Sequence, residues 1–410
     1  MKTLYVCYFG LREPLVQTQV LPYLRALATS GLGVYLLTFE PEMKTAWSSQ
    51  AEIEERERLA AAGINWSTLP YHKTPTVPAT LFDIVAGARA VIRLVQQHGI
   101  DVIHARAHIP LAMALLAQRV TARRLVFDLR GLMAEEYADA GIWAEGSLKF
   151  RGIKNLEKAG LKEADQIVVL TRAMRDYLVE HQLASADKIE VIPCCVDFDR
   201  YTANENERES AERFEVIYAG SVSGLYLLDE MGRFFEAVRA REPRAFLKIL
   251  TTSPAEEAAA RLQRAGVHPD HFWIGKVAAG EVPRGLRSAR IGLSFRKPTF
   301  SQVAASPTKI PEYLAAGIPV VSNAGVGDVD NLLEEHRVGV VVREFTVAEF
   351  ERAAEVAIAL ANDEGTRARC VEVARRNFDL QVVGARGYAN VYERIARMND
   401  GDKTSLEVHV

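Results

Sequence analysis

Short apolar runs alternate with longer amphipathic segments along most of this chain. The first run covers residues 3–9, and in residues 15–28 the apolar positions recur at helical spacing. The pattern then predicts strands at 34–39, 64–69, 101–104, 125–127, 167–170 and 189–192, and helices at 81–97, 111–119, 148–163 and 172–180. Strands that alternate with helices in this way predict a parallel sheet with helices on both faces.

The same pattern stops at a polar, highly charged stretch and then restarts. Residues 199–213 have the composition of a linker, and strands are predicted again at 216–219, 246–250, near Phe272 and at 291–295. We therefore predict an α/β protein with two doubly wound, Rossmann-like domains at 1–198 and 214–380. The segment 381–410 contains a last helix that we expect to return to the first domain. Two such domains can place their strand carboxyl ends around a shared cleft, with one substrate bound by each domain.

The segment 295–342 is the most informative part of the second domain. At its centre stands SPTKIPEYLAAGIPVVSNAGVGDVDNLL. We predict that Thr308 caps a helix, because Pro311 then falls in the first turn, where its missing N–H removes no hydrogen bond. Gly317 is expected to end this helix, and Asp328 to cap a second one after a short strand. Helix amino termini and the charge of Lys309 would together attract an anion such as a phosphate.

Length, composition and charge limit the function classes. A chain of 410 residues suggests two domains, and 49% hydrophobic with 25% charged residues is typical of a globular protein. A net charge of −3, from 50 basic and 53 acidic residues, argues against nucleic acid as a partner. Four cysteines without zinc-like spacing (Cys7, Cys194, Cys195 and Cys370) indicate a reducing compartment. Without a spanning run or a signal peptide, we expect a cytoplasmic protein, and contact with the inner face of the membrane stays open.

Polar residues at two strand ends of the first domain are further candidates. His104, Arg106 and His108 alternate as a strand does, and no acid is spaced to complete a metal site, so we predict no metal there. They would contact an acceptor or form buried hydrogen bonds. Asp128 and Arg130 follow the next strand and would face the same edge or pair with each other. Glu135 and Glu136 are weaker candidates.

Several segments spread over nearly the whole chain carry a family resemblance. They read YFGLREPLVQTQVLPYL, DVIHARAHIP, FDLRG, ADQIVVLTRAM, VIPCCVD, YAGSVSG and SPTKIPEYLAAGIPVV. In this combination the chain resembles the GT-B glycosyltransferases, and more closely their retaining family 4. The resemblance implies a nucleotide sugar bound mainly by the second domain, an acceptor bound mainly by the first, and no required metal or other cofactor. It also implies that Glu312 holds the ribose hydroxyls.

Two departures from the family pattern change the expected site. Ala304 stands where the family carries an acid, so any role of that acid toward the donor sugar must be absent or taken over by another group, such as the backbone of Ala305 and Ser306. The loop after Gly220 lacks the basic residues often found there. Arg296, Lys297 and Lys309 are then the expected cations for the pyrophosphate, where fixed positive charge would stabilise the departing group.

These considerations assign the candidate residues to three groups. The expected catalytic residues are Lys309, Arg296 and Glu312. The expected donor-binding residues are Gly220, Ser221, Lys297, Ser306, Pro307, Thr308, Asn323, Ala324, Gly325 and Val326. The expected acceptor-binding residues are Gly10, His104, Arg106, His108, Asp128 and Arg130.

Other functions stay open on the residues alone. A nucleotide-sugar epimerase of the same architecture would turn over without an acceptor, and an inactive nucleotide-sugar sensor would bind without transfer. A dehydrogenase is disfavoured because the first strand is followed by FGLREP, which has only one glycine. The residues identify neither the base, the sugar nor the acceptor. Because no covalent nucleophile stands out, we expect delivery of the acceptor on the same face that the phosphate leaves.

Overall fold

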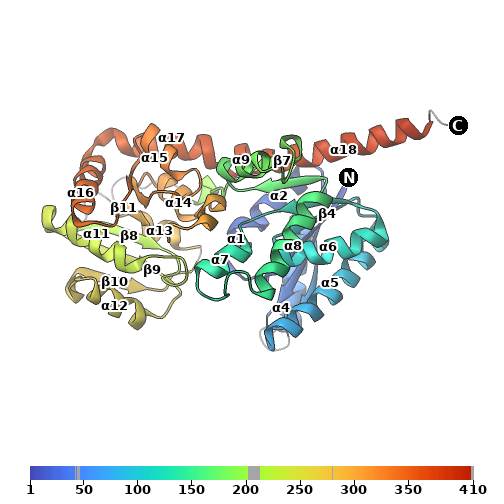
Figure 1. The fold of residues 1–410 in the computed structure, drawn as a ribbon, viewed down its shortest axis with the longest axis horizontal. Coiled ribbons are helices and arrows are strands. Elements are labelled where there is room, and N and C mark those ends of the chain that lie inside the picture. Colours follow the sequence, from blue (N-terminus) through green and yellow to red (C-terminus); the bar gives the residue numbers. More distant parts are fainter. Residues whose placement is uncertain (42, 44–46, 202–212, 279, 408–410) are drawn as a thin grey trace. The chain divides into compact units, whose positions relative to one another are not determined.

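The computed structural model describes residues 1–41, 43, 47–201, 213–278 and 280–407, with the side chains placed up to residue 399. The chain divides into two compact units, coloured by sequence in Figure 1. Unit 1 comprises Met1–Ala134, Glu145–Ile192 and Gly384–Val410, and unit 2 comprises Glu135–Ala144 and Pro193–Val383. Most of the expected linker, residues 202–212, lies outside the described residues, and the expected shared cleft stays a prediction.

Unit 1 contains a seven-stranded parallel sheet in the order β3-β2-β1-β4-β5-β6-β7. Its strands are β1 (Lys2–Cys7), β2 (Gly33–Glu40), β3 (Ile64–Pro70), β4 (Val102–Arg106), β5 (Arg124–Asp128), β6 (Gln166–Val169) and β7 (Ile189–Val191). Its helices are α1 (Pro14–Gln19), α2 (Leu21–Thr29), α4 (Ser49–Ala61), α5 (Thr76–His98), α6 (His108–Thr121), α8 (Leu148–Glu163) and α9 (Arg172–Glu180), while α7 (Met133–Asp139) spans the boundary between the units. The predicted doubly wound sheet is confirmed, because the strands are added outward from β1 first in one direction (β2, β3) and then in the other (β4 to β7).

The predicted helix at 15–28 is divided into α1 and α2. Val20 leaves the helical conformation, with φ −129° and ψ −65°, and Pro22 lies in the first turn of α2. Since proline has no N–H, Pro22 cannot donate to Thr18 across the break. The apolar periodicity alone continues through both helices, so the pattern did not show the interruption.

Unit 2 contains a six-stranded parallel sheet in the order β10-β9-β8-β11-β12-β13. Its strands are β8 (Phe214–Ala219), β9 (Ala245–Leu250), β10 (Phe272–Gly275), β11 (Ala289–Ser294), β12 (Val320–Asn323) and β13 (Gly339–Val342). Its helices are α11 (Leu228–Arg241), α12 (Ala255–Arg264), α13 (Val282–Leu286), α14 (Lys309–Ala315), α15 (Val329–Glu335), α16 (Val347–Asn362) and α17 (Glu364–Phe378). Separate apolar clusters pack α11 with α16 and α14 with α17, so both faces of the sheet are covered.

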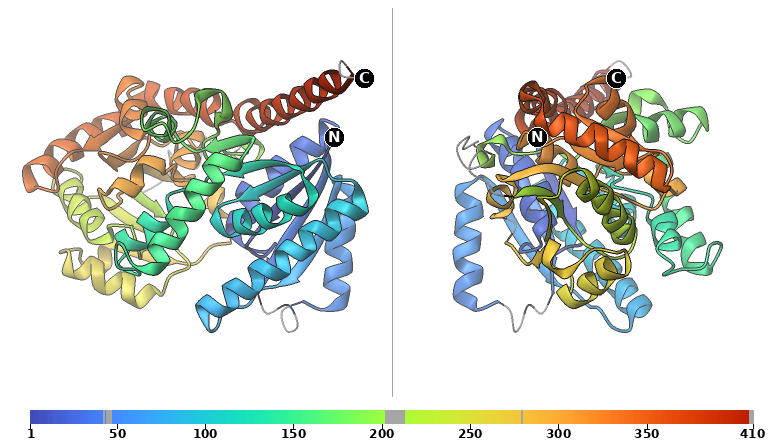
Figure 2. Two further views of the ribbon diagram at one scale, coloured as in Figure 1. Left: turned by 45° about the vertical axis from the view of Figure 1, so that its right-hand side comes forward. Right: turned by 90° about the vertical axis from the view of Figure 1, so that its left-hand side faces the viewer.

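The last helix, α18 (Arg386–Glu407), belongs to unit 1. The Tyr388 hydroxyl donates to Asp128 Oδ2 at 2.9 Å, and the Tyr392 hydroxyl lies 2.8 Å from His104 Nδ1 and 3.1 Å from Thr3 Oγ1. Figure 2 shows α18, in red, close to the amino terminus. Unit 1 is thus built from both ends of the chain.

Before the chain enters unit 2, the last residue of unit 1 is Ile192, whereas we expected the domain boundary at residue 198. Cys194 N–H donates to Ser306 Oγ at 3.1 Å, and Val196 N–H donates to the Phe378 carbonyl at 2.8 Å. These bonds attach residues 193–198 to unit 2. Within the part of the chain that the structure describes, no helix is long and apolar enough to cross a membrane.

Candidate active site

The carboxyl ends of three neighbouring strands of unit 2 bring the main candidates together. Gly220 follows β8, Arg296 lies just beyond β11, and Asn323 ends β12. β8 and β11 are adjacent, and the chain order reverses between them, which is where open parallel sheets bind ligands. Arg296 N–H donates to Asn323 Oδ1 at 2.7 Å, so two of these strand ends are fixed to each other.

Two cations share one aromatic ring at this edge. Lys309 Nζ lies 4.2 Å from the centroid of the Tyr226 ring and 5.1 Å from that of Tyr218. Arg296 Cζ lies 4.9 Å from the Tyr226 ring, and Arg296 Nε donates to Gln302 Oε1. Both cationic side chains are largely buried, with Lys309 only 3% exposed. This pair and its ring are called the Lys309–Tyr226–Arg296 cluster below.

The electrostatics of the cluster favour an incoming anion. Burial lowers the pKa of Lys309, because the desolvated ammonium forms no ion pair in the described part of the chain. The pKa of the Tyr226 hydroxyl is also lowered, mainly by Lys309 and against the effect of burial. A phenol is a weak partner for two buried cations. Phosphate oxygens would satisfy them far better.

Gly220 makes room for the Lys309 side chain. Its φ of +142° is a conformation that favours glycine, and a Cβ there would lie 3.3 Å from Lys309 Cε and 3.4 Å from Nζ. The neighbouring Ser221 is exposed, and its carbonyl accepts a hydrogen bond from the Tyr218 hydroxyl. The absence of a Cβ at Gly220 therefore allows the loop after β8 to lie close to the Lys309 ammonium group.

Glu312 lies one turn further into α14 and is half-buried. Burial raises the pKa of its carboxyl group, while Arg200 and Tyr201 oppose that shift. Its charge in turn raises the pKa of Lys309, although burial is the larger effect. The ribose role of Glu312 stays a prediction.

Several groups around the start of α14 already form hydrogen bonds within the protein, whereas we expected them to be available to a ligand. Thr308 precedes the helix, but it is already in the right-handed helical conformation and its side chain forms no capping bond. Ile310 N–H donates to the Pro307 carbonyl at 3.1 Å, and Ala305 N–H donates to the Gln302 carbonyl at 3.0 Å. Ser306 Oγ accepts from Cys194 N–H. The backbone N–H of Ala305 is thus engaged and is not available to replace the family acid.

The loop after β12 also uses several of its groups internally. Ala324 N–H donates to the Val342 carbonyl, Gly325 N–H donates to Asp330 Oδ2 at 2.9 Å, and Val326 is buried. Asp328 precedes α15 without a side-chain cap, so the expected capping bond is absent. Donor contacts from residues 323–326 stay a prediction.

Lys297 has a different partner from the one we expected. Its Nζ donates to the Asp139 carbonyl at 3.0 Å, and its backbone N–H donates to the Leu225 carbonyl. The side chain thereby fixes residues 135–144, which belong to unit 2. A donor phosphate would have to displace this bond.

Tyr226 and Gln302 are the residues that the sequence pattern did not single out. Tyr226 lies in the loop after Gly220, where the family resemblance led us to look for basic residues. Gln302 lies in a short 3-10 helix (Phe300–Ala304) that Ala304 ends, and its amide also donates to Ser301 Oγ at 2.8 Å. No short sequence pattern indicated Gln302, which stands in the mixed stretch TFSQVAA before SPTK.

Most candidates of unit 1 form a buried network beneath α18. The exposed fractions of His104, Arg106, His108 and Asp128 are 3% or less. Asp128 Oδ2 lies 3.6 Å from both His104 Nε2 and Arg106 NH1, and Asp128 Oδ1 lies 3.5 Å from Arg130 NH1. Burial acts to raise the pKa of Asp128, but Arg130, His104 and Arg106 together hold it below its usual range. Acceptor contact, buried hydrogen bonds and mutual ion pairs were the alternatives for these residues. The structure shows hydrogen bonds and ion pairs within the buried network.

His108 and Gly10 are the two acceptor candidates that do not contact Asp128. His108 Nε2 lies 3.0 Å from Glu157 Oε2, which joins α6 to α8. Gly10 is buried, and a Cβ there would lie 2.7 Å from Pro41 Cδ. Arg130 is the least buried member of the network, with its side chain 10% exposed. Acceptor contacts by Gly10 and Arg130 stay predictions.

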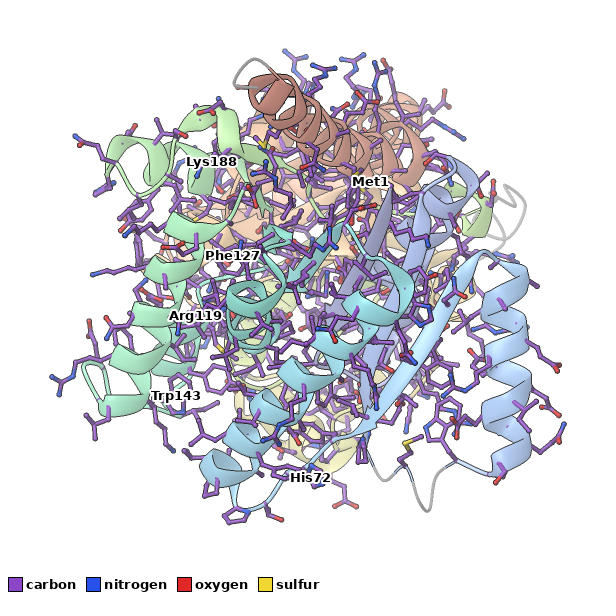
Figure 3. All side chains as sticks on the ribbon, turned by 90° about the vertical axis from the view of Figure 1, so that its right-hand side faces the viewer. Met1, His72, Arg119, Phe127, Trp143 and Lys188 are labelled. Atoms are coloured by element: carbon purple, nitrogen blue, oxygen red, sulfur yellow. The ribbon has the colours of Figure 1, made fainter. Side chains whose placement is uncertain are left out.

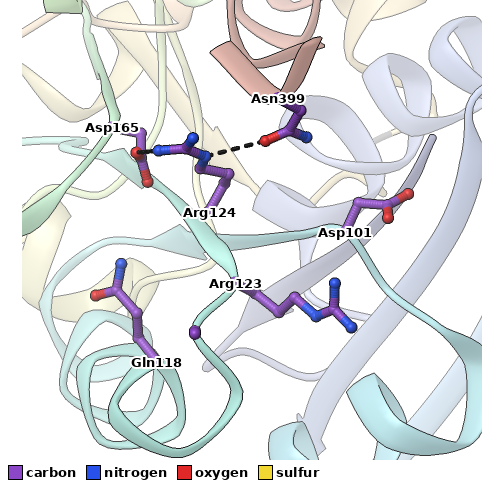
Figure 4. Close-up of a pocket in the computed structure, with 7 residues that line it drawn as sticks. Asp101, Gln118, Arg123, Arg124, Asp165 and Asn399 are labelled. Carbon is purple, nitrogen blue, oxygen red and sulfur yellow. Dashed lines mark hydrogen bonds and ion pairs between the residues drawn. The ribbon is translucent and has the colours of Figure 1, made fainter. Parts of the chain in front are cut away.

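A polar pocket of unit 1 lies away from the strand carboxyl ends. Asp101, Gln118, Ala122, Arg123, Arg124, Asp165 and Asn399 line it, and Figure 4 shows Arg124 between Asp165 and Asn399. Arg124 begins β5, so this pocket lies at the amino end of the sheet, where parallel sheets do not usually bind substrates. Among the described residues, no group of three or more His, Cys, Asp or Glu side chains could hold a metal ion.

Comparison with known proteins gives a family match in the first half of the chain. Residues 16–200 match the family described as Glycosyltransferase Family 4. TuaH of Bacillus subtilis (strain 168), named for a role as a glycosyltransferase in teichuronic acid biosynthesis, is 25% identical over 171 residues. That match covers 41% of this chain and 43% of TuaH, so it spans less than half the length of this relative.

Two solved structures share the fold over nearly the whole chain. Sucrose-phosphate synthase from Thermosynechococcus elongatus has a TM-score of 0.71 at 14% identity, covering 97% of this chain and 100% of that one. HepE from Anabaena, in complex with UDP and glucose, has a TM-score of 0.68 at 14% identity, covering 96% and 99%. The chain thus matches Glycosyltransferase Family 4 over residues 16–200, and over nearly its whole length it has the GT-B fold of these solved structures.

Proposed function

We propose that this chain transfers a sugar from a nucleotide-diphosphate sugar to an acceptor, and that unit 2 binds the donor. The observation that carries the proposal is the Lys309–Tyr226–Arg296 cluster at the carboxyl edge of the sheet. HepE, which has the same fold, has been solved with UDP and with UDP-glucose, and this supports a nucleotide sugar as the ligand class.

Charge development in the reaction explains why two buried cations are suited to it. When the bond between the sugar and the diphosphate breaks, negative charge grows on the phosphate oxygen. Donors that are already oriented in a site without water stabilise such charge more strongly than solvent does, commonly by about 2.7–4 kcal/mol for a single group. Lys309 and Arg296 are held in place by Tyr226 and Gln302, so they need little reorganisation when the donor binds.

We further propose retention of configuration without a metal. The departing phosphate oxygen takes the proton from the acceptor hydroxyl, while the sugar carbon loses its bond to that phosphate and bonds to the acceptor oxygen on the same face. Lys309 and Arg296 would supply the positive charge that a metal supplies in other transferases. NMR of the product's anomeric proton tests this step, and an inverted product would refute it.

A thermal-shift screen of nucleotide sugars tests the donor class. A specific donor at about a hundred times its dissociation constant should stabilise the protein by about 2.7 kcal/mol. The donor that does so is then incubated with pools of acceptors. Transfer supports the proposal. Turnover of the donor sugar without any acceptor would indicate an epimerase, and binding without transfer or hydrolysis would indicate a sensor.

A further inference from the structure

The polar pocket of unit 1 is separate from the candidate active site and has no role in the proposed transfer. It lies where the amino ends of β4 and β5 meet the last turn of α6 and the part of α18 around Asn399. Its volume is about 600 Å³, which is within the range of pockets that hold small molecules. Figure 3 labels Met1, just before β1, and Arg119, in the last turn of α6, on this unit.

The charges that line the pocket are balanced. Among the described residues it contains two arginines and two aspartates. Arg124 is paired with Asp165, with 2.8 Å between Nη1 and Oδ1. Arg123 and Asp101 form no ion pair with each other or with another described residue. In Figure 4 the guanidinium group of Arg123 extends toward the side of the pocket on which Asp101 lies. One cation and one anion are thus open to the same ligand.

The other polar groups of the pocket can each form further hydrogen bonds. Asp101 Oδ2 accepts from Lys2 N–H at 2.8 Å, which leaves Oδ1 available. Asn399 Oδ1 accepts from Arg124 Nε at 3.0 Å, so its NH2 group remains a donor. The side-chain amide of Gln118 forms no hydrogen bond within the described part of the chain. Donors and acceptors are therefore both present around one cavity.

These features favour one class of ligand over the others. An apolar molecule would find a single apolar residue, Ala122, in the described lining. A free anion such as phosphate would be attracted by Arg123 but repelled by Asp101. A neutral molecule with several hydroxyl groups fits both, because each hydroxyl can donate one hydrogen bond and accept others. It can satisfy the carboxylate and the guanidinium group together without adding charge to the pocket.

We propose that this pocket is an accessory saccharide-binding site. A sugar bound here donates a hydroxyl to Asp101 Oδ1, accepts from the Arg123 guanidinium group, and bonds to the amides of Gln118 and Asn399. The pocket lies at the amino ends of the strands, so the site holds a saccharide acceptor or product and is not the place of transfer. Binding at this site concerns unit 1 alone, and it does not require that unit 2 binds a nucleotide sugar.

Calorimetry and ligand-observed NMR on the full chain test the proposal. The probes are glucose, galactose, mannose, N-acetylglucosamine and maltose, with phosphate and glycine as an anion and a zwitterion of small size. We expect saturable binding of at least one sugar, and none of phosphate or glycine at the same concentration. Hydrogen exchange then locates the bound sugar. The amides of residues 118–124 and of α18 around Asn399 should exchange more slowly in its presence.

Variants of two lining residues separate this pocket from other sites. Gln118→Leu should weaken sugar binding about fivefold and Arg123→Leu at least about tenfold, because hydrogen bonds to charged groups contribute more than those to neutral groups. Gln97→Leu and Arg93→Leu are the matched controls, since both residues are exposed on α5 and do not line the pocket. They should bind the sugar as the unchanged protein does. Coinciding thermal unfolding of all four variants would show that each is folded.

Several results would overturn the proposal. One is that none of these sugars binds, and another is that Gln118→Leu and Arg123→Leu bind the sugar as well as the two control variants do. Exchange that slows only in residues 220–226 and 306–312 would place the sugar in the candidate active site instead. Binding of phosphate or glycine in place of the sugars would show that the pocket selects charge and not hydroxyl groups.

Discussion

Replacing Lys309 by methionine shows whether this lysine serves catalysis or the stability of the fold. Methionine has a similar length and apolar stem, so it fills the same space but removes the ammonium group. The variant tests whether the buried charge serves the fold or the donor. The two possibilities predict opposite results for stability and for transfer.

The structure sets the expected magnitudes. A buried cation without an ion pair carries a desolvation cost of several kcal/mol. Its contact with the Tyr226 ring, at 4.2 Å, returns about 2 kcal/mol in a desolvated setting. Lys309→Met should therefore leave the free energy of unfolding unchanged or increase it. If Lys309 stabilises the departing phosphate, transfer should fall about 10²- to 10³-fold.

The assay combines chemical unfolding with transfer from the donor found in the thermal-shift screen. Lys248→Met is the matched control, because Lys248 Nζ lies 3.4 Å from Glu215 Oε2 on the middle of the sheet of unit 2. That partly exposed pair contributes at most about 1 kcal/mol to stability, and its loss should leave transfer unchanged. A Lys309→Met protein that is destabilised by more than about 2 kcal/mol but transfers normally would refute the reasoning.

Three further predictions follow from the same contacts. Tyr226→Phe keeps the ring near both cations but removes the hydroxyl, so the free energy of unfolding should change by less than about 1.5 kcal/mol. Tyr226→Ala removes the ring as well. It should weaken donor binding, measured by calorimetry, by at least tenfold, which is about 1.4 kcal/mol. Gly220→Ala should cost about 1–2 kcal/mol of stability and also lower transfer, because its Cβ would press on Lys309 and strain the backbone; equal transfer by this variant would contradict the site. Asp128→Asn should cost about 3–5 kcal/mol because two buried arginines lose their partner, against at most about 1 kcal/mol for exposed Asp176→Asn. The pKa of Asp128 is depressed in the folded protein. Its contribution to stability is therefore complete above the pKa of about 4 in the unfolded chain, and it is lost as the pH falls further. In acid, the free energy of unfolding should consequently change less steeply with pH in Asp128→Asn than in the unchanged protein.

Much of the architecture could be predicted because parallel strands are buried on both faces. Runs such as 216–219 are almost uniformly apolar, and the helices between them keep a clear period. Gly317 was expected to end α14, and it does so with φ +71°. Pattern reasoning failed at Val20, where apolar periodicity continues across the break between two helices.

The candidate site could be predicted only in part, because its decisive contacts are not local. Lys309 and Arg296 were found through their positions beside a helix start and a strand end. Tyr226 was missed because nothing in GLYLL indicates that its ring contacts two cations from other segments. The polar residues at the end of β4 have the pattern of a binding edge. Their partner Tyr392 stands 288 positions from His104, and no short pattern indicates that α18 covers them.

The division of unit 1 between the two ends of the chain has a consequence for biosynthesis. Asp128 and His104 are made early, whereas Tyr388 and Tyr392 leave the ribosome only after all of unit 2 has been synthesised. Until then, the charged interior of the first sheet has the Tyr5 hydroxyl but lacks the two hydroxyl groups that α18 supplies. Unit 2 can complete its own core first, so the sheet of unit 1 should reach its final state only after α18 has left the ribosome.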